Sequence, residues 1–173
     1  MRNEQVIDRI RQTYLLGNLR TPIQDVEYAV MQLAEVAVRA MSPAINDPYT
    51  AMTCLHHIGA GLSLRVSQDE RPCCFYDGDG RVRLIFEPAT VGELLEAGFG
   101  ILRRASRDNA QVLLAIRTAI EQIAHNAQQP EVRAELRQQV RLVEAESRAS
   151  AAVDWDRERI HQRCTELADL LLS

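Results

Sequence analysis

The sequence predicts an all-α fold, a bundle of about six to seven helices with one small β-hairpin insert at about residues 73–87. Three observations support this prediction. Apolar residues recur every three or four positions through most of the 173 residues, as in helices with one buried face. Prolines and capping residues mark the starts of several of these segments. The pair Asp79-Gly80, which is favoured in hairpin turns, stands between two short β-prone runs.

The first helix is predicted over residues 3–16, and the second begins at Thr21-Pro22. Thr21 can cap that helix, Pro22 suits its first position, and Gln24 completes a capping box. The helix should end at Ser42, because the following proline disfavours helical geometry there. Its expected buried positions are Ile23, Val26, Val30, Leu33, Ala37 and Met41.

The third helix begins at Asp47-Pro48, again a cap followed by a first-turn proline. Two glycines, Gly59 and Gly61, lie inside it and lower helix propensity, which favours a close approach of another helix at those positions. Its expected buried positions are Ala51, Met52, Leu55, Ile58, Leu62 and Val66.

The remaining helices follow the hairpin. Thr90 and Glu93 form a second capping box at the start of one, a further helix runs from after Asn109 to about Ala127, and Pro130 opens the next. No glycine or proline interrupts residues 131–172, so one long helix and two shorter ones are both compatible with the sequence. The expected buried side of the last segment is Trp155, Ile160, Cys164, Leu167 and Leu171. The whole chain, 1–173, is interpreted as a single helical domain.

Composition excludes several classes of function. A formal net charge of −4 does not favour nucleic acid as a partner. The four cysteines form no Cys-x-x-Cys pair, so no metal site is predicted, and they indicate a reducing compartment. No run approaches the roughly 20 apolar residues that span a bilayer, so the chain as given is expected to be soluble. No sequence signature identifies a cofactor or an enzyme.

One segment, RAMSPAINDPYTAM at residues 39–52, concentrates groups that could form a site. Ser42, Asn46, Asp47 and Thr50 gather at a helix start, where anions are attracted, and Arg39 lies about one turn earlier. Together with Arg20 they could hold a carboxylate or a phosphate. The alternative is a structural corner, because Asp47 already supplies a cap and its charge opposes an incoming anion.

Residues 17–58 carry a longer pattern. The matched positions are Gly17, Arg20, Thr21, Gln24, Asp25, Arg39, Ala40, Ser42, Pro43, Ala44, Asn46, Asp47, Pro48, Thr50 and Ala51. On these residues the chain resembles a family of predicted bacterial membrane proteins, the domain of unknown function 2254 family. The resemblance implies transmembrane helices in segments absent from this chain and a soluble tail that includes it. It implies no activity.

The resemblance also widens the candidate set to Arg20, Gln24, Asp25, Arg39, Ser42, Asn46, Asp47 and Thr50. Gln24 and Asp25 could meet Arg39 only through tertiary or intersubunit contact, because fifteen residues of helix span about 22 Å. A ligand site or subunit interface and a structural corner are both left open for these residues.

The preferred hypothesis is an assembly and ligand-sensing module on the cytoplasmic side of a bacterial inner-membrane protein. It would form a homo-oligomer and bind a small anionic ligand at the corner. Two alternatives are a hydrolase, with Asp47 or Asp25 as base and Arg39 holding the substrate, and a free-standing soluble structural protein.

Overall fold

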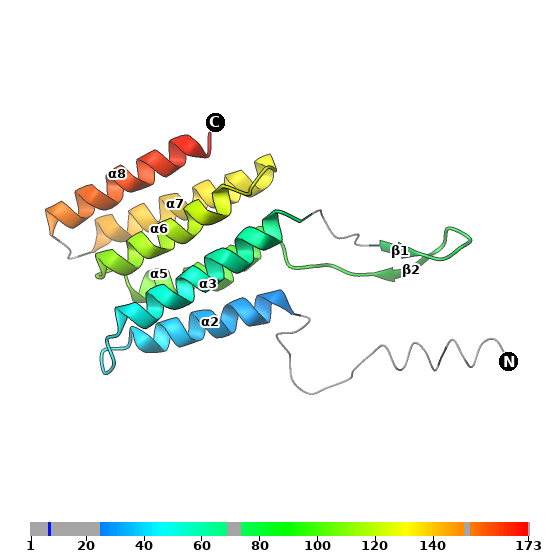
Figure 1. Ribbon diagram of the computed structural model, residues 1–173, viewed down its shortest axis with the longest axis horizontal. Coiled ribbons are helices and arrows are strands. Elements are labelled where there is room, and N and C mark those ends of the chain that lie inside the picture. Colours follow the sequence, from blue (N-terminus) through cyan, green and yellow to red (C-terminus); the bar gives the residue numbers. More distant parts are fainter. Residues whose placement is uncertain (1–6, 8–24, 69–73, 151–152, 173) are drawn as a thin grey trace.

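The computed structural model describes residues 7, 25–68, 74–150 and 153–172. Within these residues it contains six helices and one two-stranded antiparallel hairpin, which confirms the all-α prediction with its β insert (Figure 1). The helices are α2 (Val26–Ala40), α3 (Pro48–Val66), the continuous helix α4 (Val91–Leu95), η1 (Glu96–Gly100) and α5 (Ile101–Ala105), then α6 (Ala110–Ala124), α7 (Pro130–Ala149) and α8 (Asp154–Leu170).

Helix α3 is central to the bundle. It packs against α2 on one side and α6 on the other, and α7 and α8 continue the bundle beyond α6 (Figure 1). Leu55, Ile58 and Leu62 of α3 are fully buried, as are Ile116 and Ile120 of α6. These positions are spaced by three and four residues, so the apolar periodicity places one face of each helix in a shared core.

The two glycines of α3 behave differently. A Cβ added at Gly59 would lie 3.0 Å from the Cβ and 3.1 Å from the Cα of Ala119, so a side chain there would collide with α6. Gly61 has open space around its Cα. The predicted close approach is therefore confirmed at Gly59 and wrong at Gly61, which faces outward.

Helix α2 begins later than the Thr21-Pro22 prediction. Asp25 has an extended backbone (φ −122°, ψ 94°), and its side chain accepts a hydrogen bond of 2.9 Å from the Tyr28 N–H, so the described helix starts at Val26. Asp is as effective a cap as Thr, and it directly precedes the apolar periodic run. The predicted capping residues Thr21 and Gln24 lie outside the described residues, as does nearly all of the predicted 3–16 helix.

Other helix boundaries lie within three residues of the prediction: α2 ends at Ala40 where Ser42 was expected, and α6 ends at Ala124 where about Ala127 was expected. Thr90 and Glu93 form the predicted capping box. The segment left open at 131–172 is two helices, because Ser150 ends α7 and Val153 precedes α8, each with an extended backbone.

Trp155 corrects the predicted buried side of the last helix. It is 68% exposed, and the Arg159 guanidinium lies 5.4 Å from its ring centroid. Trp155 precedes the buried Cys164 by nine residues, and nine steps of about 100° place the two on opposite sides of a helix. The prediction was wrong because it assumed that a tryptophan is buried and did not check its angular position on the helix against the other buried residues.

The predicted insert is a hairpin that leaves the far end of α3 and extends away from the bundle (Figure 1). Strand β1 (Cys74–Tyr76) pairs antiparallel with β2 (Val82–Ile85), with Phe75 opposite Leu84 and a bulge beside Tyr76. Gly80 adopts φ +76° in the turn, a conformation that suits glycine. Asp77 accepts backbone hydrogen bonds from Asp79 and Arg81, and these lock the turn.

Candidate functional site

The corner between α2 and α3 is closed by its own backbone. The Asp47 N–H donates to the Ala40 carbonyl at 2.8 Å, and the Asn46 and Ile45 N–H groups donate to the Ser42 carbonyl at 2.8 and 3.0 Å. Asn46 has φ +48°, which asparagine tolerates better than most side-chain-bearing residues. Within the corner, Ser42 and Asn46 therefore set the chain reversal that brings Asp47 to the start of α3.

Asp47 directs its carboxylate at its own helix. Its Oδ1 accepts hydrogen bonds of 3.1 Å from the Tyr49 and Thr50 N–H groups, and its Oδ2 accepts one of 2.5 Å from the Thr50 hydroxyl. The hydroxyl bond from Thr50, followed by the backbone bond from Thr50, holds the pKa of Asp47 below its usual value. The group is therefore an ionised cap at the helix end, and a lowered pKa makes it a weak general base.

The remaining described candidates lie apart. Arg39 forms an exposed ion pair with Glu35 one turn earlier on α2. Asp25 caps the opposite end of α2, about 20 Å away along fourteen residues of helix. Arg20 and Gln24 lie outside the described residues. The structure thus brings together Ser42, Asn46, Asp47 and Thr50, with Arg39 nearby, and it separates Asp25 from them.

Two neighbouring side chains were absent from the predicted site. Ile45 is 61% exposed and Tyr49 is 74% exposed, so the corner presents apolar surface between its polar groups. The sequence signal was available, since both residues lie inside the motif at positions that capping does not require.

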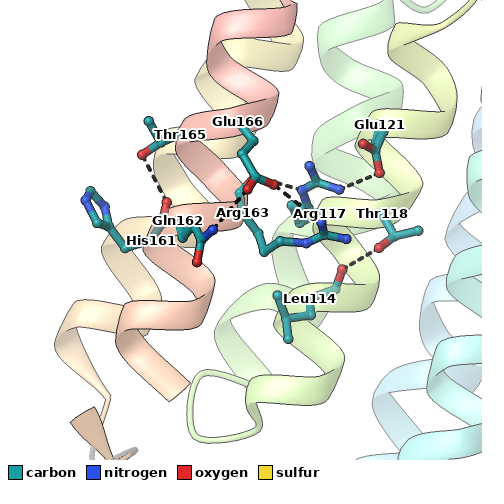
Figure 2. A network of polar contacts seen from close by, with 9 residues as sticks. All are labelled: Leu114, Arg117, Thr118, Glu121, His161, Gln162, Arg163, Thr165 and Glu166. Atoms are coloured by element: carbon teal, nitrogen blue, oxygen red, sulfur yellow. Dashed lines mark hydrogen bonds and ion pairs between the residues drawn. The ribbon is translucent and has the colours of Figure 1, made fainter. Parts of the chain in front are cut away.

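A second polar network lies in the bundle, between α6 and α8 (Figure 2). Arg117 is almost completely buried; its Nε donates to the Arg163 carbonyl at 2.9 Å, and its guanidinium pairs with Glu121. Exposed ion pairs such as Arg163–Glu166 lie nearby on the surface of α8. Sequence reasoning missed Arg117, which occupies a buried position of the α6 periodicity. Its role is to join two helices.

Cys164 lies on the buried face of α8, close to a histidine–glutamate pair. His161 Nδ1 is 2.6 Å from Glu144 Oε1. Burial raises the pKa of the Cys164 thiol to about 11, with a further increase from Glu144. A buried thiol that stays protonated at neutral pH is a poor nucleophile, so these residues do not form a cysteine-hydrolase site.

A surface pocket of about 490 Å³ lies at the base of the hairpin, where α3 ends and α4 and α7 begin. Arg65, Thr90, Glu131 and Glu135 are among its lining residues, whereas the described corner candidates are not. In the described residues, no group of three or more His, Cys, Asp or Glu side chains is arranged to hold a metal ion. The described lining residues of the pocket carry both signs of charge.

In the part of the chain that the structure describes, exposed apolar side chains are grouped on the hairpin. We call its six large exposed side chains the hairpin surface: Phe75, Tyr76, Val82, Leu84, Ile85 and Phe86. Cross-strand partners share a face, so Phe75 and Leu84 lie on one side of the ribbon and Ile85 lies on the other with Cys74. Both sides therefore carry apolar side chains. The uninterrupted run Leu84-Ile85-Phe86, which does not alternate with polar residues, was the signal for this.

Comparison with known proteins adds a family and several relatives. A family model described as "Predicted membrane protein (DUF2254)" matches residues 1–122. An uncharacterized protein of Mycobacterium tuberculosis (strain H37Rv) is 29% identical over 157 residues, and one of Mycobacterium bovis matches equally. These residues are 89% of this chain and 30% of each relative, so the chain spans under a third of the curated relatives it matches. No solved structure matches.

Proposed function

Because the chain belongs to the DUF2254 family of predicted membrane proteins, we propose that it is the assembly module of a bacterial inner-membrane protein. It acts on the cytoplasmic side and binds other copies of itself. None of the helices in the described ranges is long and apolar enough to cross a bilayer. Membrane attachment in this proposal therefore belongs to other segments, and the greater length of the relatives is consistent with it.

The observation that carries the proposal is the hairpin surface. Ile85 is 66% exposed and Tyr76 is 64% exposed, and they lie at opposite ends of the paired segment. The hairpin that carries them projects from the bundle (Figure 1). An isolated two-stranded hairpin is marginally stable in water, and further strands or a packed face are needed to stabilise it. Exposed apolar patches of this kind mark interaction sites on proteins.

The polar chemistry of the corner supports a binding role over a catalytic one. Asp47 and Thr50 are engaged with each other, and Arg39 is engaged with Glu35. A base for hydrolysis would need a free carboxylate near a substrate position. In this proposal the corner serves as a rigid end of the bundle, and Ile45 and Tyr49 form a second contact surface.

The test is the oligomeric state of the 173-residue chain, measured by light scattering coupled to size exclusion over a wide concentration range. We expect a mass of twice 19.5 kDa that dissociates on dilution. The double variant Ile85→Ser/Phe86→Ser should be monomeric at concentrations where the parent is a dimer. Leu64→Ser is the matched control, because Leu64 is similarly exposed but lies on the bundle surface of α3.

A parent chain that is monomeric throughout, or a control that dissociates as readily as the hairpin variant, would contradict the proposal. The cellular side needs a separate experiment. In bacteria that express the complete protein, protease should cleave this domain in inside-out membrane vesicles and spare it in intact spheroplasts.

A further inference from the structure

We propose that the free edge of β2 pairs antiparallel with β2 of a second copy, centred on Leu84, so that two hairpins form one four-stranded sheet. This inference rests on the proposed self-association and names the surface and register that produce it. The partner is a second copy of this chain.

The first argument is the open edge of β2. This strand hydrogen-bonds to β1 in the described hairpin, which is a two-stranded sheet, so its other edge has unpaired backbone groups. Residues 81–87 are all exposed. An exposed apolar edge strand is a template for pairing with another chain. Pairing with a second β2 would satisfy these backbone groups and place the apolar side chains of the two β2 strands side by side on each face of the sheet.

The second argument is charge. Arg81 directly precedes β2 and Glu87 follows its last residue by two positions, and in the described part of the chain neither side chain has an ion-pair partner. A symmetric dimer that uses the same edge twice must pair it antiparallel. Pairing centred on Leu84 places Arg81 opposite the partner's Glu87 at both ends of the contact. Opposite charges at facing positions stabilise a sheet, and like charges destabilise it.

The third argument distinguishes this register from its nearest charge-matched alternative. A centre at Ile85 would place Arg83 opposite Glu87, but Arg83 already contacts Asp77 with its Nε 2.6 Å from Oδ2. That register would also place Pro88 opposite Val82, and proline has no N–H to donate to the ladder. The centre at Leu84 uses the unpaired arginine and avoids the proline.

A lipid bilayer fits this hairpin less well than a second copy of the chain does. A bilayer covers one face of a ribbon that lies on it, whereas Leu84 and Ile85 point to opposite faces. Insertion by the tip would bury Asp77 and Asp79, each at a cost of several kcal/mol at bilayer depth. A second strand pair avoids both difficulties.

Disulfide trapping tests the register. The parent for this experiment carries Cys73→Ser and Cys74→Ser, because the other two cysteines, Cys54 and Cys164, are buried. Leu84→Cys places two thiols at the symmetry centre, where facing Cα atoms are about 5 Å apart and within disulfide range. We expect rapid formation of a covalent dimer under mild oxidation.

Val82→Cys is the matched control. In this register two copies of residue 82 are offset by four residues, about 14 Å along the strand, and cannot be bridged. A mixture of Val82→Cys chains and Phe86→Cys chains should instead give a mixed covalent dimer, because those positions face each other.

Charge reversal supplies an independent readout. Arg81→Glu and Glu87→Arg should each weaken dimerisation on the order of tenfold, because each creates two like-charged pairs across the interface. The double variant Arg81→Glu/Glu87→Arg should recover most of the parent affinity. A merely structural effect on the hairpin would not be repaired in this way.

The outcomes separate the two proposals. A dimer that forms without trapping at Leu84→Cys, or without charge rescue, would overturn the pairing and leave the assembly function standing. A chain that stays monomeric would overturn both. A monomer that sediments with phosphatidylglycerol vesicles, and loses this when Ile85 and Phe86 are replaced by Ser, would identify a lipid surface as the occupant instead.

Discussion

The two connections at the ends of α3 contain similar types of residue, but one satisfies its own hydrogen-bonding groups and the other leaves a strand edge unpaired. The corner before it (residues 41–47) and the hairpin after it both combine turn-forming residues, an aspartate and exposed apolar side chains. In the corner, Asp47 accepts hydrogen bonds from the first turn of α3, and the backbone closes the loop. In the hairpin, Asp77 stabilises the turn while the outer strand edge and both faces stay open.

The difference shows that a dense polar motif and an available binding surface are separate properties. The corner holds most of the described polar candidates, yet Asp47 and Thr50 bind each other and Arg39 pairs with Glu35. In the described residues the hairpin carries no recognised catalytic or binding motif, but its six large apolar side chains are exposed. Variants of inward-directed residues should therefore change folding stability, and variants of the hairpin should change association.

The largest expected effect comes from the bundle interior. Arg117→Ala should lower the free energy of unfolding by about 3 kcal/mol, because it removes a buried guanidinium and leaves the Arg163 carbonyl and Glu121 without their partner. Urea unfolding followed by circular dichroism measures this change. Arg163→Ala is the control: that side chain pairs with Glu166 at the surface, so its loss should cost less than about 1 kcal/mol. Equal costs for the two variants would refute the structural role of Arg117.

The second prediction uses the two glycines of α3. Gly59→Ala should destabilise the protein by about 1–2 kcal/mol, because the new Cβ would approach Ala119 closely. Gly61→Ala meets open space, so it should stabilise the protein by up to about 1 kcal/mol through helix propensity alone. Thermal unfolding of both variants under one set of conditions tests the difference in sign. A stabilising Gly59→Ala would contradict the close packing of α3 on α6.

The third prediction concerns the corner and its pH dependence. Asp47→Ala should lower the melting temperature at pH 7 by about 2–4 °C through loss of the helix cap. The folded-state pKa of Asp47 lies below its ordinary value of 3.8. Its charge-dependent stabilisation is therefore fully present above that value and is lost as pH falls through the folded-state pKa.

Comparing the parent with Asp47→Asn isolates this contribution from other carboxylates with lowered pKa values, such as Glu93. The difference in melting temperature should be constant from pH 7 to about 5 and shrink toward pH 2. A difference that does not change with pH would show that the ionised cap makes no contribution.

Most of the helix periodicity and two of the predicted helix starts followed from local spacing, whereas Val26, expected to be buried, is 42% exposed and the described cap of α2 is Asp25. Asp47-Pro48 and the pair Thr90 and Glu93 each supply a hydrogen-bond acceptor within three residues of the donors they satisfy. Trp155 was mispredicted even though local spacing was sufficient, because nine residues separate it from the buried Cys164 and place it on the opposite side of the helix. Arg117 was missed for a different reason: its main partner on α8, the Arg163 carbonyl, is 46 residues away.

The candidate site was partly predictable in the same sense. The sequence placed Ser42, Asn46, Asp47 and Thr50 in one corner, because Pro43 ends one helix and Asp47-Pro48 starts the next within a few residues, which favours a tight chain reversal. It could not show that Asp47 and Thr50 would bind each other. It also could not show that both faces of the hairpin would remain exposed, because exposure depends on which distant elements pack against a segment.

The smallest expected effect on stability belongs to the hairpin, and it is the most informative for the comparison. In dilute solution, where the chain is monomeric, Ile85→Ser should change the unfolding free energy of the bundle by less than about 0.5 kcal/mol. The side chain is mostly exposed and the hairpin stands clear of the core. Ile58→Ala, at a buried position of α3, should cost about 2–5 kcal/mol under the same conditions. At high concentration the parent should gain stability through association, and Ile85→Ser should not. If Ile85→Ser instead destabilises the dilute monomer as Ile58→Ala does, then the hairpin packs on the bundle, and its surface is unavailable to a second copy.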